Sequence, residues 1–224
     1  MPEGVYDQSV KCNMQWDWYR KDIWMKILFA TGNAGKMKEI RMILADLGME
    51  IRSLKDAGID VDIEENGATF AENAKIKVLA LREYVDSETI ILADDSGLVV
   101  DALDGAPGVY SARYMGYNTS YDEKNANIIQ RVNESGRERS ARFTAAIAAL
   151  LPDGRIAVTE GHMEGEIATE PAGAGGFGYD PILYLPAFGV TSAELSPEEK
   201  NAISHRGQAL EKMKDYLREA LQLQ

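Results

Sequence analysis

The sequence predicts an α/β fold in which helices flank a mixed central sheet. Short apolar runs typical of buried strands alternate with amphipathic stretches that begin at helix-capping residues. This alternation is typical of parallel strand–helix–strand units. Two longer alternating runs joined by Asp153-Gly154 add an antiparallel hairpin, because Asp-Gly is a favoured two-residue hairpin turn. We therefore expect parallel and antiparallel strands in the same protein.

The elements of the first half follow from apolar spacing and capping residues. A strand at 26–30 precedes a helix that Gly48 ends, with its apolar face formed by Met37, Ile40, Leu44 and Leu47. A short strand near 49–53 leads into an acidic loop at 60–67. Thr69 and Glu72 form a capping box, which predicts a helix with one apolar face made of Ala71, Ala74, Val78, Leu81 and Val85.

The second half begins with a strand at 89–93 and a separate extended run at 98–103. Ser120 caps a helix that extends to about Asn133, and the hairpin strands at 141–151 and 155–167 follow. After a glycine-rich loop, Ser196-Pro197 starts one helix, and a last helix follows with a stripe made of Leu210, Met213, Leu217 and Leu221.

Composition excludes several classes of protein. The chain has 224 residues and a net charge of −12, which disfavours binding to nucleic acid or to an anionic membrane. Its single cysteine, Cys12, excludes an intrachain disulfide and fits a reducing compartment. With two histidines, a zinc site of the Cys/His type is disfavoured, so oxygen ligands and hence magnesium or manganese are the expected metal chemistry.

Residues 1–24 differ from the rest of the chain. They contain all three tryptophans and have neither clear periodicity nor the apolar core of a signal peptide. A strand begins directly after Met25. We therefore expect residues 1–24 to be a dispensable N-terminal extension and residues 25–224 to form a single domain.

The segment Ala93-Asp94-Asp95-Ser96-Gly97-Leu98 is the most informative candidate for chemistry. It places two adjacent carboxylates where the apolar run ends, and strand ends carry chemistry in α/β proteins. Neighbouring acidic side chains there need a cation or a proton to offset their repulsion. Taken alone, the same residues fit a polar strand-to-turn boundary equally well.

Two glycine-rich segments have different prospects. Gly173 to Gly178 matches the dinucleotide-binding spacing, but no strand precedes it and no helix follows, so we reject that function. The segment 31–36 fails the Walker pattern because Met37 follows Lys36. It is nevertheless a strand–loop–helix junction with a lysine, which suits a phosphate about as well as it suits a plain turn.

Five motifs in order resemble the inosine triphosphate pyrophosphatase family from Met25 onward. They are Thr31-Gly32-Asn33 with Lys36, the 93–98 segment, Gly105-Ala106-Pro107-Gly108 followed by Tyr110-Ser111-Ala112-Arg113, Phe177-Gly178-Tyr179-Asp180-Pro181, and Ser204-His205-Arg206. The resemblance implies a two-lobed fold with the active site in the cleft between the lobes. It also implies a cytoplasmic, homodimeric, Mg²⁺-dependent enzyme that cleaves ITP, dITP and XTP to the monophosphate and pyrophosphate.

The resemblance also implies roles for individual residues. Asp95 becomes the catalytic carboxylate and a metal ligand, and Glu64 a second metal ligand, with its neighbour Glu65 left as an alternative. Mg²⁺ is the implied metal and Mn²⁺ a substitute. The substrate-binding positions are Thr31, Gly32, Asn33, Ala34, Gly35, Lys36, Lys77, Ser96, Phe177, Gly178, Tyr179, Asp180, Lys200, His205 and Arg206.

Three other functions compete with this interpretation. A nucleotide kinase or P-loop NTPase is opposed by the missing Walker serine or threonine. A nucleotide-sensing module that binds without turnover is opposed by the intact acidic ligands. A relative of the septum-inhibition type, acting on modified pyrimidines, is the nearest alternative among hydrolases. The sequence does not decide whether water attacks the α- or the β-phosphorus.

Overall fold

The computed structural model describes residues 26–223, so the expected extension at 1–24 lies outside the described residues. They form a seven-stranded sheet in the order β2-β1-β3-β4-β5-β6-β7. β1 (Lys26–Phe29) pairs in parallel with β2 (Glu50–Ser53) and β3 (Ile90–Val100). Antiparallel pairing then adds β4 (Ser140–Leu150), β5 (Ile156–Ile167), β6 (Leu183–Leu185) and β7 (Val190–Thr191). The mixed α/β fold is confirmed.

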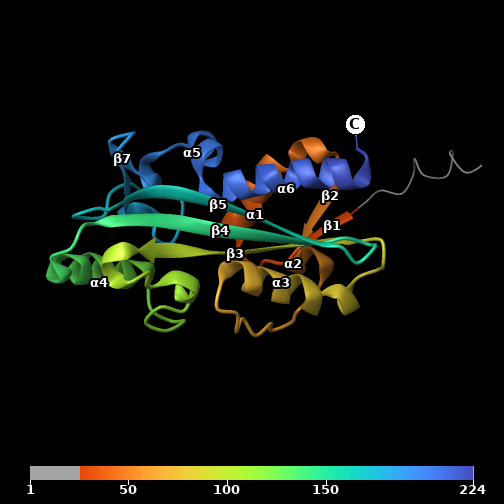
Figure 1. Cartoon of the computed structure of the whole chain (residues 1–224), viewed down its shortest axis with the longest axis horizontal. Helices are drawn as coiled ribbons and strands as arrows, with labels where there is room; N and C mark the ends of the chain where they lie inside the picture. Colours follow the sequence, from red (N-terminus) through yellow and green to blue (C-terminus); the bar gives the residue numbers. More distant parts are fainter. Residues whose placement is uncertain (1–25, 224) are drawn as a thin grey trace, which may run out of the picture.

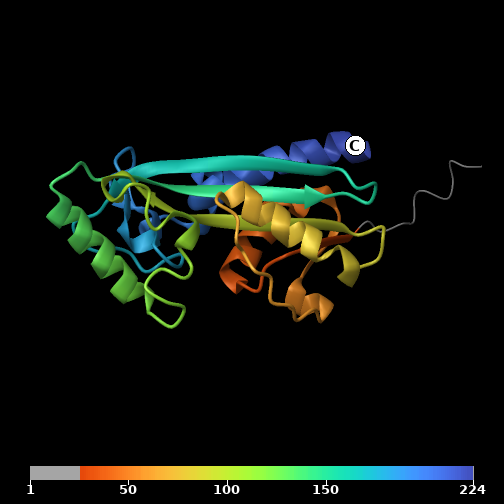
Figure 2. The ribbon, with the colours of Figure 1, turned by 60° about the horizontal axis from the view of Figure 1, so that its bottom comes forward.

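Helices cover both faces of this sheet. α1 (Ala34–Ile43) and α6 (His205–Leu221) lie on one face, and α3 (Phe70–Ala80) lies on the other beside the short α2 (Leu54–Ala57) (Figure 1). Toward the far end of the long strands lies α4 (Tyr121–Ser135), well separated from α3 (Figure 2). α5 (Pro197–Ile203) leads directly into α6.

Three buried clusters show how alternation along the strands builds the core. Ile27 and Phe29 of β1 pack toward α1 and α6, whereas Leu28 packs toward α3. Successive side chains of a strand point to opposite faces, so one sequence serves both layers. A separate cluster at the far end joins Leu98 of β3 to Ile128 of α4 and Leu183 of β6. The molecule therefore has two lobes that share the long strands β3, β4 and β5.

The expected helix starts are confirmed by their caps. Thr69, Ser120 and Ser196 each begin a helix with a complete capping box, and Ser204 caps α6 by accepting a hydrogen bond from the Gly207 amide. Two helix ends differ from the prediction. α1 stops at Ile43 and α3 at Ala80, and each is followed by a short 3₁₀ turn. Gly48 adopts φ 66°, but it ends the 3₁₀ turn Ala45–Leu47.

One expected boundary is wrong. The runs at 89–93 and 98–103 are a single strand, β3, which continues through Asp94 and Asp95 and ends at Val100. β4 pairs with β3 from Ile91 to Val100, and this long partner keeps the acidic segment extended. Gly97 lets the loop at 108–111 approach β3, because a Cβ there would lie 2.9 Å from the Ser111 Cβ.

The start of α6 rests directly on β5. A Cβ at Gly161 of β5 would lie 2.8 Å from the Ala209 amide nitrogen and would collide with the His205 carbonyl. Glycine therefore allows the backbones of helix and strand to touch.

Within residues 26–223, no helix has both the length and the apolar character needed to cross a membrane.

Candidate active site

A cavity of about 410 Å³ lies where β1 ends and β3 continues without it. Both lobes contribute to its wall, which confirms the expected cleft. The wall contains most of the predicted site residues: Thr31, Gly32, Asn33, Lys36, Lys77, Asp95, Ser96, Phe177, Gly178, Tyr179, Asp180, Lys200, His205 and Arg206. Ala34, Gly35 and Glu64 do not line it.

The two adjacent carboxylates point to opposite faces of the sheet. Asp94 shares its face with Leu92, which packs toward α1 and α6, whereas Asp95 shares its face with Ala93, which packs toward α3. Because β1 has already ended, the cavity reaches both carboxylates at the uncovered edge of β3. Each carboxylate therefore has its own set of cations, which relieves the repulsion expected from the sequence.

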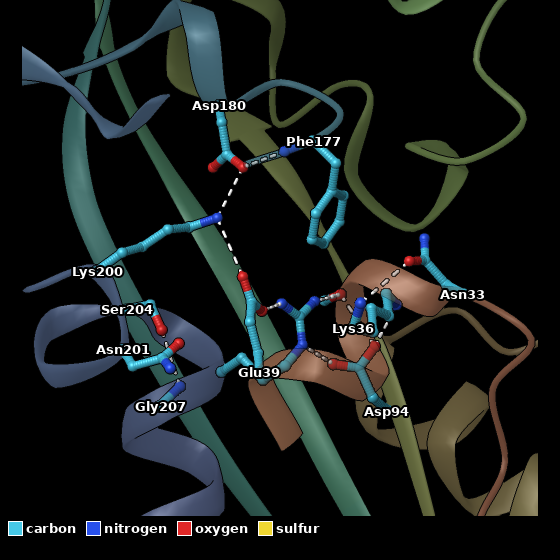
Figure 3. A network of polar contacts seen from close by, with 12 residues as sticks. Asn33, Lys36, Glu39, Asp94, Phe177, Asp180, Lys200, Asn201, Ser204 and Gly207 are labelled. Atoms are coloured by element: carbon cyan, nitrogen blue, oxygen red, sulfur yellow. Dashed lines mark hydrogen bonds and ion pairs between the residues drawn. The ribbon is translucent and has the colours of Figure 1, made fainter. Parts of the chain in front are cut away.

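Asp94 lies at the centre of a buried ion cluster (Figure 3). Its carboxylate pairs with the Lys36 ammonium from α1 and, at 3.0 Å, with Nε of Arg206 from α6. Burial alone would raise the pKa of Asp94, but Arg206 and Lys36 outweigh it and hold the pKa far below the usual carboxyl range. Burial lowers the pKa of Lys36. Asp94 is thus a fixed anion that orients two cations in the cavity.

Glu39 of α1 joins a second set of cations to the first. Its carboxylate binds the Arg206 guanidinium and lies 3.2 Å from Lys200 Nζ, which in turn lies 2.7 Å from Asp180 (Figure 3). Asp180 also accepts a hydrogen bond of 2.8 Å from the Phe177 amide. The network fixes the loop that carries Phe177, and the Lys200 ammonium lies 5.2 Å from the centre of the Phe177 ring.

Asp95 is held on the opposite face by α3. The Asn73 amide donates a hydrogen bond of 3.0 Å to one carboxylate oxygen, and Lys77 Nζ lies 3.3 Å from the other. Burial raises the pKa of Asp95, although Lys77 and Asn73 act in the opposite direction. Burial opposes the charge of Lys77, but the carboxylates of Asp95 and Glu65 outweigh it and raise its pKa. Burial therefore favours the protonated form of Asp95, whereas Lys77 and Asn73 favour the ionised form.

The acidic loop brings one of its two neighbouring glutamates to the site. Glu65 lines the cavity and pairs with Lys77 at 3.0 Å, and its carbonyl accepts a hydrogen bond of 3.2 Å from Arg113. Glu64 is exposed, and among residues 26–223 it forms no ion pair. The structure thus places Glu65 at the cavity, whereas the exposed carboxylate of the neighbouring Glu64 has no ion-pair partner among residues 26–223.

The first turn of α1 fits the expected phosphate-binding role. Asn33 caps the helix by accepting a hydrogen bond of 3.0 Å from the Lys36 amide, and Lys36 reaches the cavity from the same turn. Backbone N–H groups at a helix start attract anions. Gly35 supports the site indirectly, since a Cβ there would lie 2.9 Å from the Phe177 ring.

His205 is buried at the start of α6 and stacks near Phe143, with ring centres 5.0 Å apart. Burial, followed by the positive charge of Arg206, lowers the pKa of His205 well below its usual value. His205 is therefore neutral at physiological pH. It lines the cavity as a neutral ring beside three cations.

The charge of the cavity wall bears on the metal. Four cationic side chains (Lys36, Lys77, Lys200, Arg206) face five acidic ones (Asp62, Glu65, Asp94, Asp95, Asp180). A polyphosphate entering this wall needs additional positive charge. No group of three His, Cys, Asp or Glu residues within 26–223 is arranged to hold a metal alone. Mg²⁺ commonly uses one or two carboxylates together with substrate phosphates, so these residues fit it.

Three residues of the site, Glu39, Asn73 and Asp94, received no role in the sequence analysis although they form ion pairs or hydrogen bonds there. Glu39 follows Lys36 by three residues, and this helical spacing places both on one face of α1. Asn73 follows the capping box directly, but its contact with Asp95 crosses 22 positions. Asp94 lies in the 93–98 motif, but the resemblance assigns a role to Asp95 and none to Asp94.

The fold and the cavity define an α/β protein with a charged cavity where β1 ends, lined by four cationic and five acidic side chains. The profile of the Ham1 family matches residues 27–216, and the chain belongs to this family. A dITP/XTP pyrophosphatase of Clostridium perfringens is 46% identical over 198 residues, which cover 86% of this chain and 97% of that protein. A dITP/XTP pyrophosphatase of Yersinia pestis is also 46% identical, over 87% of this chain and 99% of that protein.

A solved structure agrees with the fold. The HAM1 protein from Coxiella burnetii matches with a TM-score of 0.78 and 42% sequence identity, covering 87% of this chain and 99% of that one. The Ham1 protein of Staphylococcus aureus matches with a TM-score of 0.75 and 40% identity. The fold expected from the sequence is therefore confirmed by relatives as well as by the structure.

Proposed function

We propose that this protein hydrolyses non-canonical purine nucleoside triphosphates (ITP, dITP and XTP) to the monophosphate and pyrophosphate. The observation that carries the proposal is the 46% identity over 86% of the chain to a dITP/XTP pyrophosphatase. The cavity supports it, since its volume of about 410 Å³ falls within the usual size of a small-molecule site. Water adds across one phosphoanhydride bond, and the products leave as two phosphate-bearing fragments.

The phosphates are proposed to bind between α1 and α3. Lys36 lies at the first turn of α1, and Lys77 reaches the cavity from α3. Both offer ammonium donors, and the positive end of the α1 dipole adds to their attraction for an anion. Hydrolysis of a phosphoanhydride needs mostly positioning and charge neutralisation, which these groups supply.

Asp95 is proposed as the general base. The residue is buried, with 7% exposed, and burial raises the pKa of its carboxyl, which favours acceptance of a proton. Asn73 and Lys77 fix its orientation. Asp95 then orients one water molecule and takes its proton as the oxygen attacks phosphorus.

Asp95 and a carboxylate of the acidic loop are proposed to hold a divalent cation, Mg²⁺ or its substitute Mn²⁺. When bound, the cation supplies the positive charge that the cavity wall lacks toward a polyphosphate. Glu64 is the proposed loop ligand, as the family resemblance implies, and Glu65, which lines the cavity and pairs with Lys77 at 3.0 Å, is the alternative.

The base is proposed to lie against Phe177. The Phe177 ring lines the cavity between Lys200 and Arg206, whose charged groups lie 5.2 and 5.7 Å from the ring centre. Arg206 only donates hydrogen bonds, so it accepts a purine with a 6-keto oxygen and disfavours the 6-amino group of adenine. Arg206 already binds Asp94, Glu39 and Ser96, which leaves two of its five N–H groups for the base.

We also propose that the enzyme acts as a homodimer in the cytoplasm, as the family resemblance implies. Size-exclusion chromatography with light scattering and cell fractionation test these two statements.

Pyrophosphate release from a panel of canonical and deaminated nucleotides tests the main proposal. With Mg²⁺, ITP, dITP and XTP should be cleaved far faster than ATP or GTP. Asp95→Asn should keep its fold by circular dichroism and lose about 10²–10⁴-fold in kcat, because an amide accepts no proton at neutral pH. ADP among the products would instead indicate a kinase or ordinary NTPase. Binding without turnover would indicate a nucleotide sensor, and cleavage confined to modified pyrimidines a different hydrolase.

A further inference from the structure

Asn73 is a fully buried polar residue that contacts both Asp95 and the acidic loop, and only its contact with Asp95 has been described so far. It lies in the first turns of α3, with 0% of its surface exposed. An amide buried in this way is costly unless both its donor and its acceptor are paired. Both are paired here, and the two partners belong to different parts of the site.

The donor of Asn73 fixes the carboxylate of Asp95. The Nδ2 group lies 3.0 Å from Asp95 Oδ2, and this contact is buried. Lys77, one helical turn further along α3, lies 3.3 Å from Oδ1. Asn73 and Lys77, four positions apart on one helix, therefore each bind one of the two carboxylate oxygens. Without Asn73, rotation of the Asp95 carboxylate would be restrained from one side only.

The acceptor of Asn73 fixes the end of the acidic loop. Its Oδ1 accepts a hydrogen bond of 2.8 Å from the Gly67 amide. The contact is close because position 67 lacks a side chain: a Cβ there would lie 2.7 Å from Asn73 Oδ1 and 2.7 Å from Glu72 Cβ. Gly67 follows Glu64 by three residues, so this bond anchors the segment that carries the loop carboxylates.

We propose that Asn73 is a positioning residue that sets the Asp95 carboxylate and the acidic loop at a fixed separation. One rigid amide spans both, so a single side chain determines where the base and the loop carboxylate stand relative to each other. The inference rests on the proposed function and extends it, because a buried residue of α3 would set the positions of the groups on which turnover depends. Asn73 does not line the cavity, so it acts through Asp95 and the loop and not on the substrate.

Two variants separate the two bonds, and a third controls for stability. Asn73→Ala removes both bonds. Asn73→Asp has nearly the same shape and keeps an acceptor for Gly67, but it replaces the amide donor by a second carboxyl group, which repels Asp95 or shares a proton with it. Val78→Ala truncates a residue of the same helix that is also 0% exposed and packs in the core away from the cavity. Each protein is measured for kcat and KM with dITP and Mg²⁺ and for thermal unfolding. Mn²⁺ binding to the nucleotide-free protein is measured by electron paramagnetic resonance.

Both Asn73 variants should lower kcat by about tenfold or more with KM within about threefold, because a misplaced reacting group slows chemistry more than it weakens binding. Asn73→Ala should also weaken Mn²⁺ binding. Val78→Ala should lower thermal stability about as much as Asn73→Ala does, but it should leave kcat and Mn²⁺ binding unchanged. An unchanged kcat in both Asn73 variants would overturn the inference, and so would a rise in KM alone.

The same experiment separates this inference from the proposed function. If the wild-type protein releases no pyrophosphate from dITP, the proposed function is wrong, and Mn²⁺ binding to the nucleotide-free proteins still decides the role of Asn73. Unchanged Mn²⁺ affinity in Asn73→Ala would then refute the positioning of the loop.

Discussion

Replacing Asp94 by Asn is expected to destabilise the fold, because Asp94 neutralises two buried cations. The side chain of Asp94 is 0% exposed, that of Arg206 2% and that of Lys36 18%. Removing one member of a buried ion pair leaves an unpaired charge and costs about 3–5 kcal/mol in the free energy of unfolding. Arg206 keeps its contact with Glu39, and Lys36 is partly hydrated, so we expect the lower end, about 3 kcal/mol.

For a chain of this size, that loss lowers Tm by about 6–12 °C, since each kcal/mol shifts Tm by about 2–4 °C. Thermal unfolding followed by circular dichroism measures the effect. Asp153→Asn is the matched control, because Asp153 pairs with Arg155 at 2.7 Å while both side chains are half exposed. Exposed pairs contribute little to stability, so the Tm of the control should hardly change.

A Tm for Asp94→Asn that equals the control would refute the reasoning, since it would show that the buried cations do not depend on Asp94. A double-mutant cycle adds a sharper test. Lys36→Met combined with Asp94→Asn removes one of the charges left unpaired, so the double variant should lose less than the two single losses together. Strict additivity would show that the two residues are not coupled.

Two further variants test the site. Glu64→Gln should raise the Mg²⁺ concentration needed for half-maximal activity by at least about tenfold, because the loss of even an indirect metal contact typically has that effect. Glu65→Gln should raise this concentration less. The reverse order would assign the metal to Glu65. Arg206→Ala should lower the ratio of kcat/KM for ITP to kcat/KM for ATP by about 5- to 150-fold, chiefly because ITP is cleaved more slowly. The corresponding ratio for ITP and GTP should change less. Equal losses on ITP and ATP would place Arg206 on the phosphates or sugar.

Local signals predicted the elements of the fold well. Capping residues at Thr69 and Ser120 and the pair Ser196-Pro197 gave the helix starts, and Asp153-Gly154 gave the hairpin. The short strands β6 and β7 and the helix α2 were missed, because elements of two to four residues carry too little periodicity to detect. The two strands depend on neighbours that only the folded sheet provides, whereas α2 begins at a local capping box of Ser53 and Asp56.

The error at β3 has a more instructive cause. A polar pair within an apolar run normally signals the end of a strand, and Asp94 and Asp95 are such a pair. Here the neighbour on one side, β1, ends at Phe29, while the neighbour on the other side, β4, continues. The carboxylates therefore follow the end of one strand while lying in the middle of another. No periodicity within β3 encodes where its neighbour stops.

The sequence predicted which residues line the cavity more fully than it predicted how these residues contact one another. The motifs and the wider family resemblance identified many of the residues that line the cavity, because each motif is short and contiguous. They did not identify Glu39 or Asn73, whose importance lies in contacts between distant elements. They also could not show that Glu65 turns toward Lys77 while Glu64 remains exposed, since adjacent residues of an irregular loop have no fixed facing.

The glycine that supports α6 has a consequence for how selectivity can change. Gly161 lies on β5, outside the cavity wall, yet the backbone of His205 rests against it. A single methyl group at 161 would push the first turn of α6 away from the sheet and carry the Arg206 guanidinium with it. Every side chain that the proposed function places at the base would be retained, and only its distance from the base would change. The proposed base contacts thus depend on a position outside the cavity wall, and a search for variants of altered specificity belongs on the sheet as much as in the pocket.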